Sequence, residues 1–185
     1  MMNIMKHALT LLLLAVVPFV ANAQSSKIPQ RIEIVESDNY SVFYIPKDDQ
    51  RTYYLSVGAL GVGNEIIQFN VDPIHELFIP LGYSLSEAIT ALDRLKALCK
   101  EKKGASIEMP GCLALGFPNE HIETVSISPM HSLLERSLEF QITRDKQVRA
   151  TYITQSTIRS LLSGVKIYRK LHPKEDVAPN EQTAQ

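Results

Sequence analysis

The sequence contains no tryptophan, two cysteines and only eight glycines among its 185 residues. Without an indole ring, a sugar site built on tryptophan stacking is disfavoured. The closest approach to a phosphate-binding pattern is Gly58-x-x-Gly61-x-Gly63, which stands between two expected strands. A dinucleotide or phosphate loop requires a strand, a turn and a helix in succession. We therefore interpret these glycines as a hairpin loop.

Motifs of nucleophilic catalysis and an excess of positive charge are also missing. No serine lies in a G-x-S-x-G elbow, and the cysteines do not form C-x-x-C. The chain has 19 lysines and arginines against 20 aspartates and glutamates. A nucleic-acid-binding protein requires a concentrated basic face. The composition thus predicts no nucleic-acid partner and gives no indication of a cofactor.

Long apolar runs are missing everywhere except at the N-terminus. Lys6 precedes an apolar stretch from Ala8 to Val20, and Ala21-Asn22-Ala23 follows. A positive n-region, a short apolar segment and a small-x-small site are typical of a cleavable secretory signal peptide. The apolar stretch is well short of the roughly 20 residues of a membrane-spanning helix. We expect cleavage after Ala23, although an uncleaved N-terminal anchor is the alternative.

Export would place the remaining residues in the periplasm or outside the cell. Cleavage would remove one lysine and no acid, which leaves 18 basic and 20 acidic side chains. The mature chain then has no segment apolar enough to span a membrane. Its length suits one domain with a sizeable core.

The two cysteines, Cys99 and Cys112, are both in the mature chain. In an oxidising compartment, an even pair in a small domain is more often bridged than not. We expect a structural disulfide, with two buried thiols as the alternative. A bridge over a loop of this size would stabilise the domain by about 3 kcal/mol.

Apolar and polar side chains alternate in many short segments, which is the pattern of half-buried strands. Turn residues at 37–39 and 144–147 predict two hairpins. The expected strands are 31–36, 40–45, 51–57, 64–71, 76–80, 105–109, 122–128, 138–143 and 148–154.

Two segments have helical periodicity. Ser84 and Glu87 fit a capping box, and apolar residues then recur at helical spacing. We expect this helix over about 84–103, with Gly104 as its stop. A second amphipathic helix is expected over about 156–171, and Pro173 ends it. Runs of strands with intervening helices predict an α+β fold, in which two amphipathic helices pack on one face of an antiparallel sheet.

The expected domain organisation follows from these elements. A signal peptide (1–23) and a flexible lead-in (24–30) precede a single α+β domain at 31–172. The segment 173–185 is polar and contains few apolar residues, so we expect a disordered tail.

Histidines offer the main candidates for catalysis. His75, His121 and His131 lie near carboxylates or between expected strands, where imidazoles can bind zinc or act as general bases. None of them forms the H-E-x-x-H spacing that places two ligands on one helix face. Ordinary surface or loop histidines are the simpler interpretation, and we expect no metal site.

Tyrosines give the one indication of a binding surface. Tyr40, Tyr44, Tyr53 and Tyr54 are concentrated in the N-terminal strands. If some of them shared an exposed face, they would suit a protein or glycan partner. Adjacent Tyr53 and Tyr54 must nevertheless point to opposite faces of a strand.

Taken together, these features predict an exported, non-enzymatic binding protein. Its partner would be another protein or a component of the cell envelope. The alternative is a small metal-dependent or histidine-using hydrolase built on His75, His121 or His131.

Overall fold

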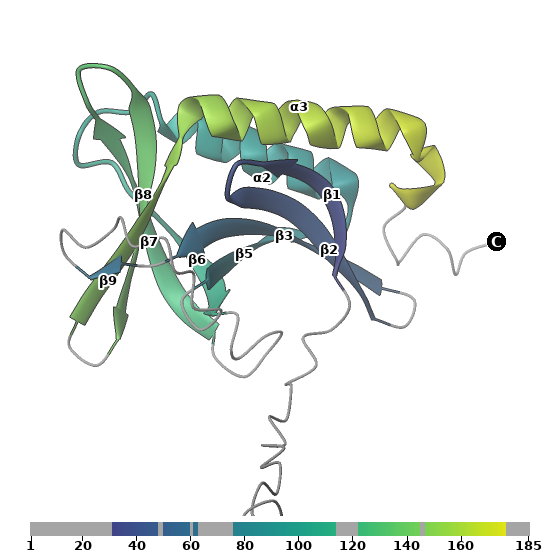
Figure 1. Cartoon of the computed structure of the whole chain (residues 1–185), viewed down its shortest axis with the longest axis horizontal. Coiled ribbons are helices and arrows are strands. Elements are labelled where there is room, and N and C mark those ends of the chain that lie inside the picture. The colour runs from purple at the N-terminus through teal and green to yellow at the C-terminus, as the bar shows by residue number, and fades with distance from the viewer. Residues whose placement is uncertain are drawn as a thin grey trace, which may run out of the picture.

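A computed structural model of the chain describes residues 31–47, 50–59, 61–62, 76–113, 122–144 and 147–176. These residues form nine strands, two α-helices and a short 3₁₀ helix (Figure 1). In chain order they are β1 (Ile32–Ser37), β2 (Tyr40–Lys47), β3 (Gln50–Ala59), β4 (Gly61–Val62), β5 (Glu76–Gly82), α2 (Leu85–Leu98), β6 (Ile107–Leu113), β7 (Ile122–His131), β8 (Arg136–Arg144), β9 (Gln147–Thr154), α3 (Gln155–Leu171) and η3 (Pro173–Glu175).

The strands form one antiparallel sheet in the order β1-β2-β3-β5-β6-β7-β8-β9-β4. A tight turn at Asp38, whose φ is 56°, joins β1 to β2 and confirms the first predicted hairpin. Strands β8 and β9 pair up to Arg144 and Gln147, which confirms the second. The expected strand at 64–71 lies outside the described residues.

The sheet curves so that β9, the last strand in the chain, comes close to β3. Only residue 60 separates β3 from β4, and β4 pairs with β9 through Gly61 and Ala150. Close to this contact the Thr151 hydroxyl donates to the Val57 carbonyl at 3.2 Å. Strand β4 therefore pairs with β9, although it follows almost directly after β3 in the chain. Strand β3 itself pairs with β5.

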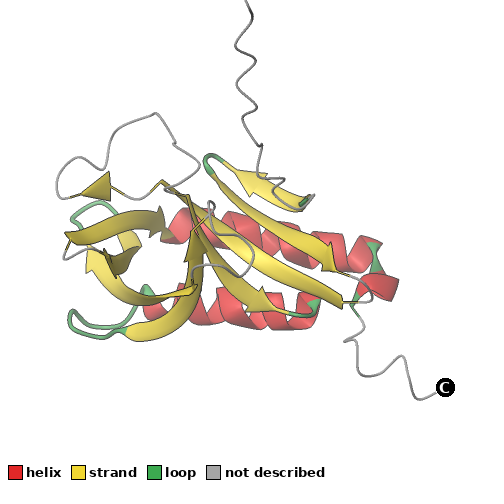
Figure 2. Cartoon of the chain, turned by 90° about the horizontal axis from the view of Figure 1, so that it is seen from below, coloured by secondary structure: helices red, strands yellow, loops and turns green. Residues whose placement is uncertain are grey.

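Both helices lie on the same side of this sheet (Figure 2). Helix α2 packs against β5 and α3 against β1, and the two helices contact each other. The predicted α+β fold, with an antiparallel sheet covered on one face by two helices, is confirmed. The core between sheet and helices contains fully buried side chains from eight of the twelve elements, among them Leu55, Leu77, Leu92, Phe140 and Leu161.

The opposite face of the sheet has a second buried cluster. Phe43, Ile45, Tyr54 and Phe78 are each no more than 8% exposed. The Phe43 ring stacks on Tyr54 at 5.5 Å between centroids and meets the edge of Phe78 at 5.1 Å. Strands β2, β3 and β5 are therefore buried on both faces, which the alternating pattern of the sequence does not predict.

The first helix begins as predicted and ends earlier. The Ser84 hydroxyl accepts from the Glu87 amide at 3.1 Å, and the Glu87 carboxylate accepts from the Tyr83 amide at 2.7 Å. This is the predicted cap, with the return bond shifted by one residue. The helix ends at Leu98, and tighter i to i+3 turns follow it. The second helix spans Gln155–Leu171, within one residue of its predicted bounds.

Gly164 in α3 allows β1 to approach the helix closely. A Cβ atom placed on Gly164 would lie 2.3 Å from one methyl group of Val35 and 2.8 Å from its Cβ. Glycine in a helix normally costs about 1 kcal/mol relative to alanine. Here the missing side chain provides the space in which Val35 packs.

Gly164→Ala is therefore expected to lower the free energy of unfolding by about 1–3 kcal/mol, the usual cost of overpacking, despite the better helix propensity of alanine. Ser163→Ala is the control, because its side chain is exposed on the same helix. Urea denaturation of both variants provides the measurement. An alanine at 164 that stabilises the domain would contradict the close packing of α3 on β1.

The chain after α3 differs from the predicted tail. Pro173–Glu175 form a 3₁₀ helix, and the carboxylates of Glu175 and Asp176 bond back to the domain. We refer to Glu175 and Asp176 as the C-terminal clasp. The predicted boundary at Pro173 is thus too early by four residues, and residues 177–185 lie outside the described part. So do the predicted signal peptide and lead-in.

Candidate functional site

The tyrosine surface predicted from the sequence does not form, and this corrects the prediction. Tyr44, Tyr53 and Tyr54 are buried, with exposures of 6%, 0% and 8%. Tyr53 faces the helices and Tyr54 the opposite cluster, so alternation places one on each buried face. Tyr40 is half-buried and donates its hydroxyl to the Tyr152 carbonyl at 2.7 Å. Tyr44, Tyr53 and Tyr54 are thus core side chains, and Tyr40 packs against the core.

Of the three candidate histidines, the structure describes only His131. It is exposed at the end of β7, and its Nε2 lies 3.2 Å from the carbonyl oxygen of Cys99. His75 and His121 lie outside the described residues. Within the described ranges, no three histidine, cysteine, aspartate or glutamate side chains are grouped as metal ligands. The hydrolase alternative therefore stays a prediction from the sequence.

The cysteines are not bonded to each other, which corrects the predicted disulfide. Cys99 lies in the core between sheet and helices. Cys112 pairs in register with Phe78 and therefore points to the face of the second cluster. The backbone of the sheet separates the two side chains. The alternative prediction, two buried thiols, is therefore the correct one.

Burial also makes both thiols unreactive. Removal from water disfavours the thiolate and raises the pKa of Cys99 and of Cys112 to about 11. The thiolate is the nucleophilic form, so little of it exists in the folded protein near neutral pH. These pKa values argue against a catalytic role for either cysteine.

Alkylation of the native protein with iodoacetamide is accordingly expected to modify neither thiol on a timescale at which a model thiol reacts fully. Alkylation in denaturant should modify both. Intact mass before and after each treatment provides the measurement. A native mass two hydrogens lower, restored by a reductant, would contradict the separation of the thiols by the sheet.

The most distinctive surface feature is the turn between β7 and β8, which we call the leucine turn (residues 132–135). The side chains of Leu133 and Leu134 are completely exposed, at 105% and 99%. Met130, two residues before the turn, is 40% exposed. Single exposed apolar residues are common on protein surfaces, but adjacent ones at a protruding tip are typical of an interaction site.

Hydrogen bonds fix the conformation of the leucine turn. The Ser132 hydroxyl accepts from the Glu135 amide at 2.9 Å and from the Leu134 amide at 3.3 Å. The Ser132 amide donates to the Glu135 carbonyl at 3.0 Å. The Ser156 hydroxyl, in the first turn of α3, donates to the Glu135 carboxylate at 2.6 Å. The turn is thus organised locally and tied to α3, with both leucines directed away from the domain.

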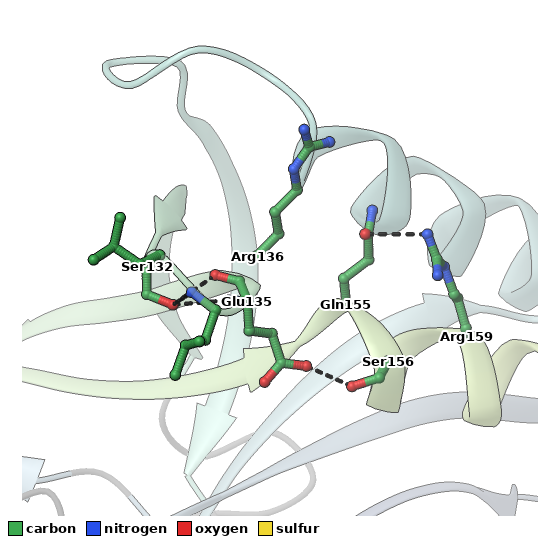
Figure 3. A pocket seen from close by; sticks show the side chains of 8 residues that line it. Ser132, Glu135, Arg136, Gln155, Ser156 and Arg159 are labelled. Atoms are coloured by element: carbon green, nitrogen blue, oxygen red, sulfur yellow. Dashed lines mark hydrogen bonds between the residues drawn. The ribbon is translucent and has the colours of Figure 1, made fainter.

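A cavity of about 370 Å³ adjoins the turn, between the β7–β8 connection and the start of α3 (Figure 3). Its lining is mixed, with two leucines beside hydroxyl, amide and guanidinium groups. The lining residues are Ser132, Leu133, Leu134, Glu135, Arg136, Gln155, Ser156 and Arg159.

The guanidinium groups of the cavity are available to a ligand. Arg159 donates to the Gln155 amide oxygen at 3.2 Å, and Gln155 lies between Arg159 and Arg136 in the view of Figure 3. Neither arginine forms an ion pair with a carboxylate of the described residues. The cavity contains one carboxylate, Glu135, which the Ser156 hydroxyl holds. Two cations and one anion therefore line it.

More cations lie at the same end of the molecule. The end of α2 reaches this region, since the Gln155 amide donates to the Lys96 carbonyl at 3.5 Å and His131 contacts Cys99. Figure 1 shows the loop after α2 beside the β7–β8 turn and the start of α3. This loop has exposed side chains at positions 100–103. We define the basic end as Lys100, Lys102, Lys103, Arg136 and Arg159.

None of the elements expected from the sequence includes the leucine turn. Its signal was a pair of leucines between two expected strands, at 122–128 and 138–143, in a segment too short for a helix. An apolar pair next to a strand is easily taken as part of that strand, because the period-2 pattern does not show where a strand ends. Ser132 and Glu135, whose hydrogen bonds close the turn, are the residues from which the turn could have been predicted.

No protein-family model, curated protein or solved structure matches this chain. Within the described ranges, none of the helices has the length and hydropathy needed to cross a membrane. The site must be interpreted from its own geometry.

Proposed function

We propose that this protein is an exported binding protein without catalytic activity, which engages a component of the cell envelope through the leucine turn. The observation that carries the proposal is the complete exposure of Leu133 and Leu134 on a turn whose conformation is already fixed. A surface that is ordered before binding loses little conformational entropy when it binds. The side chains of Leu133 and Leu134 gain no burial in the isolated domain, which supports a role in binding.

Export rests on the sequence of residues 1–23. Lys6, the apolar stretch and Ala21-Asn22-Ala23 support cleavage after Ala23. The protein recovered from outside the cytoplasm should then begin at Gln24. N-terminal sequencing that finds Met1 would contradict export by cleavage.

The binding proposal is tested with the exported protein and the envelope fraction of the organism that carries the gene. Leu133→Ala/Leu134→Ala is expected to lower the affinity for the envelope at least tenfold, measured by co-sedimentation. Burial of one leucine side chain contributes about 1.5–3 kcal/mol, and 1.4 kcal/mol corresponds to a factor of ten.

Ile167→Ala/Leu171→Ala is the matched control. These residues are 58% and 70% exposed on α3, away from the turn, so the variant removes similar apolar surface from another site. It should bind like the original protein. Equal binding by both double variants, or no binding by the original protein, would contradict the proposed function.

A further inference from the structure

The structure points to a specific partner for the leucine turn, and this inference rests on the proposed function. We propose that the partner is an anionic phospholipid surface: Leu133 and Leu134 enter the boundary between headgroups and acyl chains, and the basic end binds lipid phosphates. Three observations support this choice, namely the shape of the turn, the charge around it and the composition of the adjoining cavity.

The shape of the turn suits insertion into a soft surface. Leu133 and Leu134 are as exposed as isolated side chains, so they protrude into solvent while they also border the open cavity. Met130 adds a partly exposed apolar side chain at the base of the turn. Interfacial binding requires apolar side chains that reach about 5–10 Å into the headgroup region, without a membrane-spanning segment. A protruding hairpin tip meets this requirement.

The charge around the turn is locally positive. The loop after α2 and the lining of the cavity together contain the five cations of the basic end and two carboxylates, those of Glu101 and Glu135, which leaves an excess of three positive charges among these residues. The whole chain has a net charge of −1. A basic surface beside apolar side chains is attracted to anionic headgroups, whereas an uncharged apolar pocket of a protein partner would not require it.

The cavity places phosphate-binding and apolar groups side by side. Arg136 and Arg159 line it together with the hydroxyl-bearing residues Ser132 and Ser156. Guanidinium groups bind phosphate oxygens in a bidentate manner and are less costly to dehydrate than ammonium groups. The two leucines line the same cavity, so a lipid whose phosphate meets the arginines would have its acyl chains on the side of the leucines.

Such binding should be reversible and sensitive to salt. Even one buried myristoyl chain gives an association constant of only about 10⁴ M⁻¹, and two leucines bury less apolar surface. The electrostatic contribution is screened as the Debye length falls from about 10 Å at 0.1 M salt to about 3 Å at 1 M. We expect the loss of affinity on raising salt to distinguish this surface from a purely apolar one.

The experiment measures co-sedimentation of the exported protein with vesicles of phosphatidylcholine mixed with an equal part of phosphatidylglycerol, and with vesicles of phosphatidylcholine alone. We expect at least tenfold tighter binding to the anionic vesicles, and a similar loss of affinity on raising the salt from about 0.05 M to about 0.5 M. Leu133→Ala/Leu134→Ala and Arg136→Gln/Arg159→Gln should each weaken binding about tenfold. Ile167→Ala/Leu171→Ala should leave it unchanged.

Thermal denaturation of each variant is the control for folding. The exposure of Leu133 and Leu134 predicts little change in melting temperature. Absence of binding to anionic vesicles, or binding that none of the turn and cavity variants weakens, would overturn the lipid proposal.

The two proposals can fail separately. If the envelope fraction binds through Leu133 and Leu134 while pure lipid vesicles do not, the lipid proposal is wrong and the partner is an envelope protein. Loss of envelope binding after protease treatment of the fraction would show this independently. If envelope binding does not depend on the leucines, the proposed function itself is wrong.

Discussion

Raising the pH from about 8 to about 11 is expected to lower the free energy of unfolding of this domain by about 5 kcal/mol. The cause is the set of acidic groups that the fold removes from water. Burial raises the pKa of Cys99 and of Cys112 to about 11, from an ordinary value of 9.0. Burial and the Glu139 carboxylate raise the pKa of Tyr152 to about 12, and burial raises the pKa values of Tyr40, Tyr53, Tyr54 and Tyr168.

The sign follows from which state loses its protons first. Below about pH 9 these thiols and phenols are protonated in both the folded and the unfolded chain, so they add no pH dependence. Between pH 9 and 11 the unfolded chain releases protons that the folded chain retains, and stability falls with pH. Each thiol with a pKa raised by two units contributes at most about 3 kcal/mol to this loss.

Urea denaturation at pH 8, 9, 10 and 11 measures the effect. Cys99→Ala/Cys112→Ala is the comparison: it should be less stable at pH 8, because it creates cavities, and should lose less stability between pH 9 and 10. Constant stability up to pH 11 would show that the thiols and phenols are not buried as the structure has them.

Removal of the C-terminal clasp is the second change with a large expected effect. Asp176 accepts hydrogen bonds from the Ser86 amide at 2.8 Å and from the Ser86 hydroxyl at 3.0 Å, and pairs with Arg169 at 2.5 Å. The Ser86 amide belongs to the first turn of α2, where amides have no partner within the helix. The clasp therefore joins the start of α2 to the end of α3.

Glu175 forms the other half of the clasp. Its carboxylate pairs with Arg51 of β3 at 3.1 Å and accepts from the Tyr168 hydroxyl at 3.1 Å. The Arg51 guanidinium also lies 5.2 Å from the centre of the Tyr44 ring. Two carboxylates thus connect both helices with the sheet.

A chain that ends at His172 is expected to lose about 3 kcal/mol of stability and to melt roughly 6–12 °C lower. A chain that ends at Asp176 is the matched control, since it retains the clasp and lacks only residues 177–185 of the segment that the sequence predicts to be disordered. Calorimetry of both proteins provides the comparison. Equal melting of the two truncated chains would show that the clasp contributes nothing.

The sequence predicted the elements of this fold and missed how they combine. Alternation identified the strands at 32–37, 40–47 and 147–154 to within about three residues, because it reports a local property, the burial of one face. The pairing of β4 with β9 depends on the curvature of the whole sheet, which no local pattern encodes. The same holds for the C-terminal clasp, whose partners lie about 90 and 125 residues away in the chain.

At the candidate site, too, the features that depend on tertiary packing were not predicted from the sequence. Some of the four tyrosines at positions 40, 44, 53 and 54 were expected to share an exposed face, but both faces of β3 are buried, and the burial of the second face follows from tertiary packing. Cys99 and Cys112 are close in sequence, yet their separation depends on the register that places Cys112 opposite Phe78. The leucine turn was missed because its exposure means that no other part of the domain covers the two leucines. A sequence pattern does not show which residues the rest of the fold covers.

Hydrogen–deuterium exchange of the exported protein, with and without anionic vesicles or envelope fraction, tests the central claim most directly. If the leucine turn is the binding surface, protection should increase at residues 130–136 and at the start of α3, and should stay unchanged at the C-terminal clasp. Protection confined to the clasp or to the far end of α3, with none at the leucine turn, would contradict it.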